Sequence, residues 1–147
     1  MLRTALAALF LLLAFVLQFR AGHMVPDFVL GALLVFAVTL SFGELLAALI
    51  IALWGLAWQP VPSIELVWFA GVPLLVALVV RRLPLAPWAA FALFLPAGVL
   101  LFYLFIDPWF ITRNPELFIR LFVGTAVFAA CIFELLRPME RDARRTV

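Results

Sequence analysis

The chain has 147 residues, of which 69% are hydrophobic and only 12% are charged. A water-soluble domain is usually about half apolar and about a quarter charged, so this composition argues against a soluble domain and indicates an integral membrane protein. The net charge of +2 does not indicate a nucleic-acid binder, because the aromatic side chains lie mainly inside apolar runs and not among clustered basic residues on a solvated face.

Six apolar runs follow one another along the chain, and each is close to the length of a membrane-spanning helix. A bilayer core about 30 Å thick needs about 20 helical residues, with a range of about 17 to 25. No charged side chain lies near the middle of a run, which argues against an ion pump, since pumps need ionisable groups at membrane depth. The predicted spans are residues 2–19, 25–42, 44–58, 64–80, 87–106 and 116–136.

The first run, residues 5–19, follows a short basic start and is therefore similar to a secretory signal. The segment after it offers no convincing small-x-small cleavage site, and further hydrophobic runs come at once. We therefore expect an uncleaved first membrane helix.

The second and third runs are separated by a helix-start signal. Ser41 and Glu44 have the spacing of a capping box, which satisfies orphan backbone donors at the start of a helix. This argues against one long re-entrant element over both runs. Asp27, Glu65 and Glu116 also stand at helix starts, where a carboxylate favours the helix dipole, so we assign them structural roles.

Two later runs contain proline near their middle. Pro73 and Pro96 each free a backbone carbonyl, and Gly71 and Gly98 lie two residues away. Paired broken helices are one indication of a transporter site. Ordinary bending is the interpretation that we favour, because no polar cluster accompanies the prolines.

Small residues at a spacing of four predict close helix packing. Ala48 and Ala52 in the third run, and Ala126 and Ala130 in the sixth, form the possible helix-packing interface. Thr125 and Ala129 lie beside the second pair. Cys131, the single cysteine, is expected to be a small packing residue.

Arginine placement predicts that both the N-terminus and the C-terminus are cytoplasmic. With that orientation the inside segments hold seven arginines and the outside segments three, which follows the positive-inside bias. The seven are Arg3, Arg81, Arg82, Arg137, Arg141, Arg144 and Arg145, and the three are Arg20, Arg113 and Arg120. Glu116 and Arg120, four residues apart, are expected to pair on a helix surface.

The fold class is therefore predicted to be all-α, an integral membrane bundle of six transmembrane helices. Residues 1–137 form the transmembrane domain, and residues 138–147 form a short basic cytoplasmic tail that could bind anionic lipid or a partner protein. The sequence contains no nucleophile–base pair, phosphate loop or metal-ligand spacing, so we expect no enzyme, cofactor or metal site.

The first part of the chain resembles the family of the rod shape-determining protein MreD. The resemblance lies in the leucine-rich first run that reaches Gln18, the Pro26-Asp27 step before the second run, and Gly43 at the third. It is strongest over residues 5–60, and beyond them only the topology is similar. Residues 54–60 depart from the family, whose third span usually ends in an aspartate and a glycine-containing loop.

The resemblance implies a non-enzymatic component of the bacterial cell-shape and peptidoglycan-elongation machinery. Such a protein is multi-pass in the cytoplasmic (inner) membrane, contacts the lipid bilayer, and binds other membrane proteins, among them a bitopic shape-determining partner. No nucleic acid is involved.

The alternative is a small-molecule-binding subunit of a transporter, similar to the substrate-binding component of energy-coupling-factor systems. That function needs convergent polar groups at the exterior mouth of the bundle. The candidates are Gln59, Glu65, Asp107 and Asn114, with Tyr103 as a further possibility.

Overall fold

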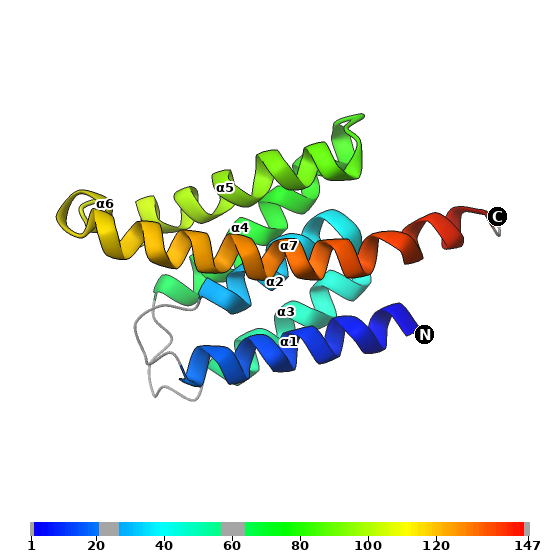
Figure 1. Cartoon of the computed structure of the whole chain (residues 1–147), viewed down its shortest axis with the longest axis horizontal. Helices are drawn as coiled ribbons and strands as arrows, with labels where there is room; N and C mark the ends of the chain where they lie inside the picture. Colours follow the sequence, from blue (N-terminus) through cyan, green and yellow to red (C-terminus); the bar gives the residue numbers. More distant parts are fainter. Residues whose placement is uncertain (1, 21–26, 57–63, 146–147) are drawn as a thin grey trace.

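The structure is a computed structural model that describes residues 2–20, 27–56 and 64–145. Over these ranges it is all-α, with six long helices, one helix of a single turn and no strand, which confirms the all-α part of the predicted fold class (Figure 1). The helices are α1 (Leu2–Arg20), α2 (Asp27–Thr39), α3 (Phe42–Leu56), α4 (Ile64–Arg82), α5 (Pro87–Ile106), α6 (Phe110–Arg113) and α7 (Pro115–Arg145).

The helix bounds follow the apolar runs closely, and the fifth run agrees at both ends. The largest difference is in α7, which continues through Pro138 to Arg145, so residues 138–145 of the predicted tail prolong this helix. With 31 residues at about 1.5 Å per residue, α7 is about 46 Å long. The short α6, between α5 and α7, was not predicted.

The second and third runs form separate helices, as the Ser41 signal predicts. Near the end of α2 the Thr39 hydroxyl donates a hydrogen bond to the Val35 carbonyl at 2.9 Å. At the start of α3 the Ser41 backbone N–H donates to Glu44 Oε2 at 2.9 Å, and the Glu44 N–H donates to Ser41 Oγ at 3.4 Å. This reciprocal pair is the predicted capping box.

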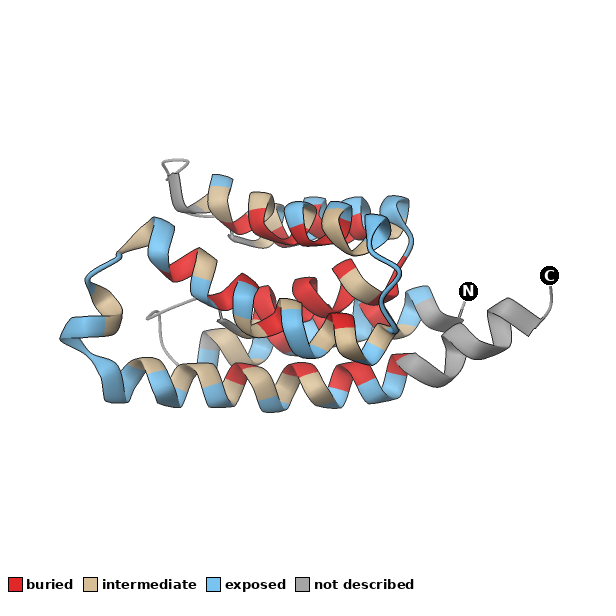
Figure 2. Ribbon diagram, turned by 90° about the horizontal axis from the view of Figure 1, so that it is seen from above, coloured by how far each residue is buried: buried red, intermediate tan, exposed pale blue. Residues whose placement is uncertain are grey.

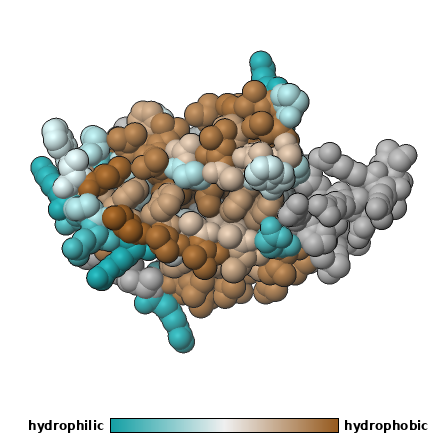
Figure 3. All heavy atoms as spheres, turned by 45° about the horizontal axis from the view of Figure 1, so that its top comes forward, coloured by the Kyte–Doolittle hydropathy of each residue, from teal (hydrophilic) through white to brown (hydrophobic). Residues whose placement is uncertain are grey.

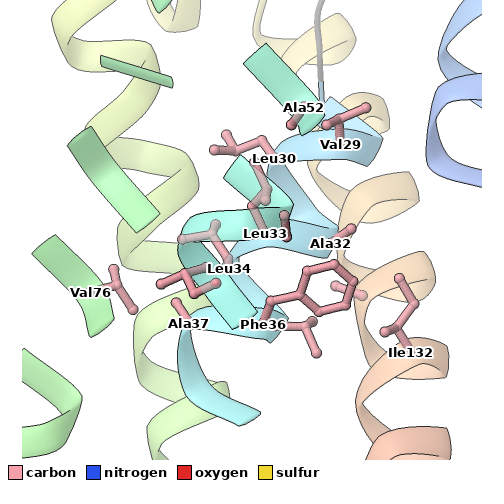
Figure 4. Close-up of a cluster of buried hydrophobic side chains, with 14 of the residues drawn as sticks. Val29, Leu30, Ala32, Leu33, Leu34, Phe36, Ala37, Ala52, Val76 and Ile132 are labelled. Carbon is pink, nitrogen blue, oxygen red and sulfur yellow. The ribbon is translucent and has the colours of Figure 1, made fainter. Parts of the chain in front are cut away.

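Helix α2 lies at the centre of the bundle and packs against α1, α3, α4, α5 and α7. The hydrophobic side chains from Val29 to Ala37 are all 2% exposed or less. They meet Ala52 of α3, Val76 of α4 and Ile132 of α7 (Figure 4). Because α2 is apolar on every side, neighbouring helices can cover it on every side.

Two glycines allow neighbouring helices to lie close to α2: Gly31 of α2 itself, which faces α7, and Gly98 of α5, which faces α2. A Cβ added to Gly31 would lie 2.8 Å from Thr125 Cγ2 on α7, and one added to Gly98 of α5 would lie 2.7 Å from Leu34 Cδ2. Both distances are shorter than carbon atoms tolerate. The packing of α5 and α7 around α2 therefore depends on these two missing side chains.

The bundle has two distinct ends (Figure 1). The start of α1, the α2–α3 turn, the α4–α5 turn and the last turns of α7 lie at one end, here called the termini end. Helix α6 and the last turn of α1 lie at the other, here called the α6 end. Buried residues gather on the inward sides of the helices (Figure 2).

Candidate functional site

The outer surface between the two ends is apolar. Large hydrophobic side chains are exposed on α1, α3, α4, α5 and α7, with Trp54 at 73%, Val67 at 68% and Ile50 at 67%. Figure 3 shows hydrophobic residues over the middle of one face and hydrophilic residues toward the ends. Soluble monomers rarely expose contiguous apolar patches of such extent.

Two helices are long and apolar enough to cross a membrane by length and composition, namely Pro87–Ile106 and Pro115–Leu136. Only 33% and 28% of their apolar windows are buried, whereas the core helix of a soluble protein is mostly buried. This gives weak support for membrane association. The other apolar helices found, Thr4–Gln18, Phe28–Thr39 and Phe42–Gly55, are shorter, and the six-span arrangement stays a prediction.

Polar side chains at the termini end bind to one another and to backbone. The Thr4 hydroxyl of α1 donates to Glu44 Oε1 of α3 at 3.2 Å. From α4, Arg81 donates to the Leu40 carbonyl just after α2 at 3.3 Å and lies 4.9 Å from the Phe42 ring centroid. These contacts connect α1, α3, α4 and the turn between α2 and α3.

This network was missed by sequence reasoning, which assigned Glu44 to a cap and Arg81 to topology. The signal that the sequence offered was the order of the helices. Consecutive antiparallel helices bring the start of the third run and the end of the fourth to the same end of a bundle. Residues 4, 40, 44 and 81 then become neighbours.

The predicted packing pair in α3 faces α1 and the core. Ala48 and Ala52 are 8% and 0% exposed. They share a helix face with Glu44, which binds Thr4, and with Gly55, where an added Cβ would lie 2.7 Å from the Phe15 ring. The small side chains therefore lie on a face of α3 that packs within the chain, against the α2 core at Ala52 and against α1 at Gly55.

The predicted packing pair in α7 lies beside the most buried small residues of this helix, and Ala126 packs against the hydrophobic core. Ala126 and Ala130 are half-buried, whereas Thr125 and Ala129 are 1% and 0% exposed and lie against Gly31 of α2. Cys131 lies on the exposed side of α7, which corrects its expected packing role.

The four predicted mouth residues are not brought together by any described contact. Gln59 and the side chain of Glu65 lie outside the described residues. The Asp107 carboxylate accepts the Trp109 backbone N–H at 3.1 Å, so it shapes its own turn. Asn114 is exposed between α6 and α7. Tyr103, the further possibility, is buried at 4% exposure.

Asn114 does line a hollow of about 390 Å³ at the α6–α7 turn. The other lining residues are Arg113, Pro115, Glu116, Leu117 and Arg120. In the part of the chain that the structure describes, no ion pair within 4.0 Å joins Glu116 to Arg120, so the expected surface pair is not formed. Exposed ion pairs gain little energy to offset the ordering of two long side chains.

Aromatic rings hold this turn in place. The Tyr103 ring of α5 stacks on Phe110 of α6, with centroids 5.2 Å apart, and meets Phe118 of α7 edge-on at 5.2 Å. Phe118 in turn contacts Phe122 at 5.9 Å. These aromatic contacts join α5, α6 and α7 next to the turn that lines the hollow.

Within residues 2–20, 27–56 and 64–145, no group of three His, Cys, Asp or Glu side chains is placed to hold a metal ion. Comparison with protein-family models, with curated proteins and with solved structures found no match.

Proposed function

We propose that this chain is an integral membrane protein that crosses the bilayer six times. The observation that carries the proposal is the exposed apolar surface between two polar ends. The described charged side chains lie toward the ends of the apolar segments, and α5 has no charged residue over 20 residues, about 30 Å. That length matches the hydrocarbon core of a bilayer.

The short helices are compatible with six spans. With 13 residues α2 is only about 20 Å long, less than the hydrocarbon thickness. Five neighbouring helices pack against it, so its apolar sides are covered by protein. The start of α1 and the last turns of α7 lie at one end, as an even number of crossings requires. The arginine bias favours a cytoplasmic location for that end.

Topology reporters test this part of the proposal. Fusions after residues 41, 84 and 147 should report a cytoplasmic location, and fusions after residues 22, 60 and 112 an external one. Alkaline phosphatase and a fluorescent protein serve as complementary reporters at each position. Two chain ends on opposite sides of the membrane would disprove both the span count and the orientation.

We further propose a non-enzymatic role in assembling the bacterial cell-shape and peptidoglycan-elongation machinery in the inner membrane. Two observations support an assembly role: the interior is filled by apolar side chains, and among the described residues only Thr39 and Thr125 are buried polar side chains. The resemblance of residues 5–60 to the MreD family supports the particular machinery.

Purification from membranes in mild detergent tests the assembly role. A bitopic wall-synthesis partner should co-purify with the full chain and be identified by mass spectrometry. Recovery of ATPase subunits in its place would contradict this function.

A small-molecule-binding transporter subunit is the second candidate, and the hollow beside Asn114 is the observation that favours it. A soluble metabolite retained by the purified protein and detected by mass spectrometry would support it. A preparation without such a compound would favour the assembly role.

A further inference from the structure

The hollow at the α6–α7 turn carries two arginines that are not engaged in ion pairs. Arg113 ends α6 and Arg120 lies in the second turn of α7, and both are exposed. Neither forms an ion pair within the described ranges. A planar guanidinium binds phosphate through two parallel hydrogen bonds, so two of them at one hollow favour a phosphate-bearing ligand.

The start of α7 adds backbone donors to the same hollow. Phe118 is the first residue of this helix whose N–H is bonded within it, to the Asn114 carbonyl at 3.0 Å. The preceding N–H groups of Glu116 and Leu117, two lining residues, have no intrahelical acceptor. The positive end of the helix dipole therefore lies beside both arginines.

An apolar track leads away from the hollow along α7. Ile119, Val123 and Val127 are 57%, 51% and 60% exposed and follow one another at a spacing of four. Val123 and Val127 also lie two turns after Glu116 and Arg120, so the track continues the face that lines the hollow. A free phosphate ion would not contact these apolar side chains, whereas an acyl chain would pack along them.

We propose that the hollow binds the phosphate of a membrane phospholipid, with an acyl chain along the Ile119–Val127 track. Arg113 and Arg120 against Glu116 leave the lining with an excess positive charge, so a headgroup of net negative charge such as phosphatidylglycerol is favoured over zwitterionic phosphatidylcholine. The inference rests on the proposed membrane location, because only a protein in lipid presents this hollow at a headgroup layer.

Lipid titration of the full chain, purified in a neutral detergent, tests the site. Native mass spectrometry counts bound phosphatidylglycerol or phosphatidylcholine for three proteins: unmodified, R113Q/R120Q, and the control R20Q/R82Q. The control removes the same charge from two exposed arginines outside the hollow. We expect R113Q/R120Q to weaken phosphatidylglycerol binding about tenfold, and the control to change it less than about twofold.

Equal weakening in the two double variants would overturn the site, because it would indicate general charge attraction. Competition by inorganic phosphate as effective as that by the lipid would also overturn it, because the ligand would then be a free anion. Far-ultraviolet circular dichroism verifies that each variant is folded. For a variant that does not fold, V123S/V127S replaces it, and lipid binding should then weaken while glycerol phosphate binding stays unchanged.

Flotation with phosphatidylglycerol–phosphatidylcholine vesicles separates this inference from the proposed location. Failure of the unmodified chain to incorporate would disprove the membrane proposal. Incorporation of all three proteins, with the same lipid count for each, would disprove the headgroup site alone.

Discussion

The two ends of the bundle are stabilised by different chemistry. At the termini end, Glu44 and Arg81 form hydrogen bonds that connect helices. At the α6 end, stacked rings around Tyr103 hold the turn, while Arg113 and Arg120 stay out of ion pairs in the described chain. Glu44 and Arg81 hold helices together and are not available to a ligand, whereas Arg113 and Arg120 are.

The largest stability effect is expected from Tyr103→Ala. The change removes a buried ring that contacts Phe102, Phe110 and Phe118, and truncation of a buried aromatic residue costs about 3–5 kcal/mol. Unfolding by SDS in mixed micelles measures the loss. Tyr103→Phe keeps the ring and should restore most of it; an equal loss in both variants would show that the ring contacts contribute little.

Glu44→Ala should come next, with a loss of about 1–2 kcal/mol, because it removes the carboxylate contacts with the Ser41 N–H, the Ser41 hydroxyl and the Thr4 hydroxyl. The same unfolding assay applies. In a double-mutant cycle, Ser41→Ala should still lower stability after Glu44→Ala, because the backbone N–H of residue 44 keeps its bond to Ser41 Oγ. The coupling energy should report the hydrogen bond between Ser41 Oγ and Glu44 Oε2, and a coupling of zero would contradict that bond.

Arg81→Gln should lose about 0.5–1 kcal/mol through its contacts with the Phe42 ring and the Leu40 carbonyl. The adjacent Arg82→Gln is the matched control, since Arg82 is exposed and has no contact of either kind. If the two variants lose equal stability, the position of Arg81 over the ring has no energetic role.

The smallest effect is expected at the hollow. Arg113→Gln and Arg120→Gln should each change the free energy of unfolding by less than about 0.5 kcal/mol in lipid-free micelles, as surface substitutions usually do. A loss comparable to that of Glu44→Ala would mean that these arginines support the fold, and the contrast between the two ends would disappear.

Much of the helical layout could be predicted from the sequence, because apolar runs of this length and the Ser41 capping signal are local properties. The central place of α2 could not, since a run that is apolar on every side has no face by which to orient it.

The choice of packing residues was only partly predictable. Ala52 is buried as expected, but in α7 the tight contact falls on Thr125 and Ala129, one residue before the predicted pair. Alanine is frequent in this chain, and only the position of Gly31 on α2 selects the register. The hollow also depends on α6, a single turn for which no local signal was recognised.

Because α2 is apolar on every side, its entry into lipid and its packing against neighbouring helices can be considered as two separate steps. In the proposed bilayer location, this helix presents apolar side chains in every direction and can enter lipid before its neighbours pack against it. Packing of α5 and α7 against it would then depend on shape, at Gly98 and Gly31, since lipid tails are as apolar as the helices that replace them. A larger residue at Gly31 would leave this first step unchanged and would require the Thr125 side chain of α7 to shift before the two helices could pack.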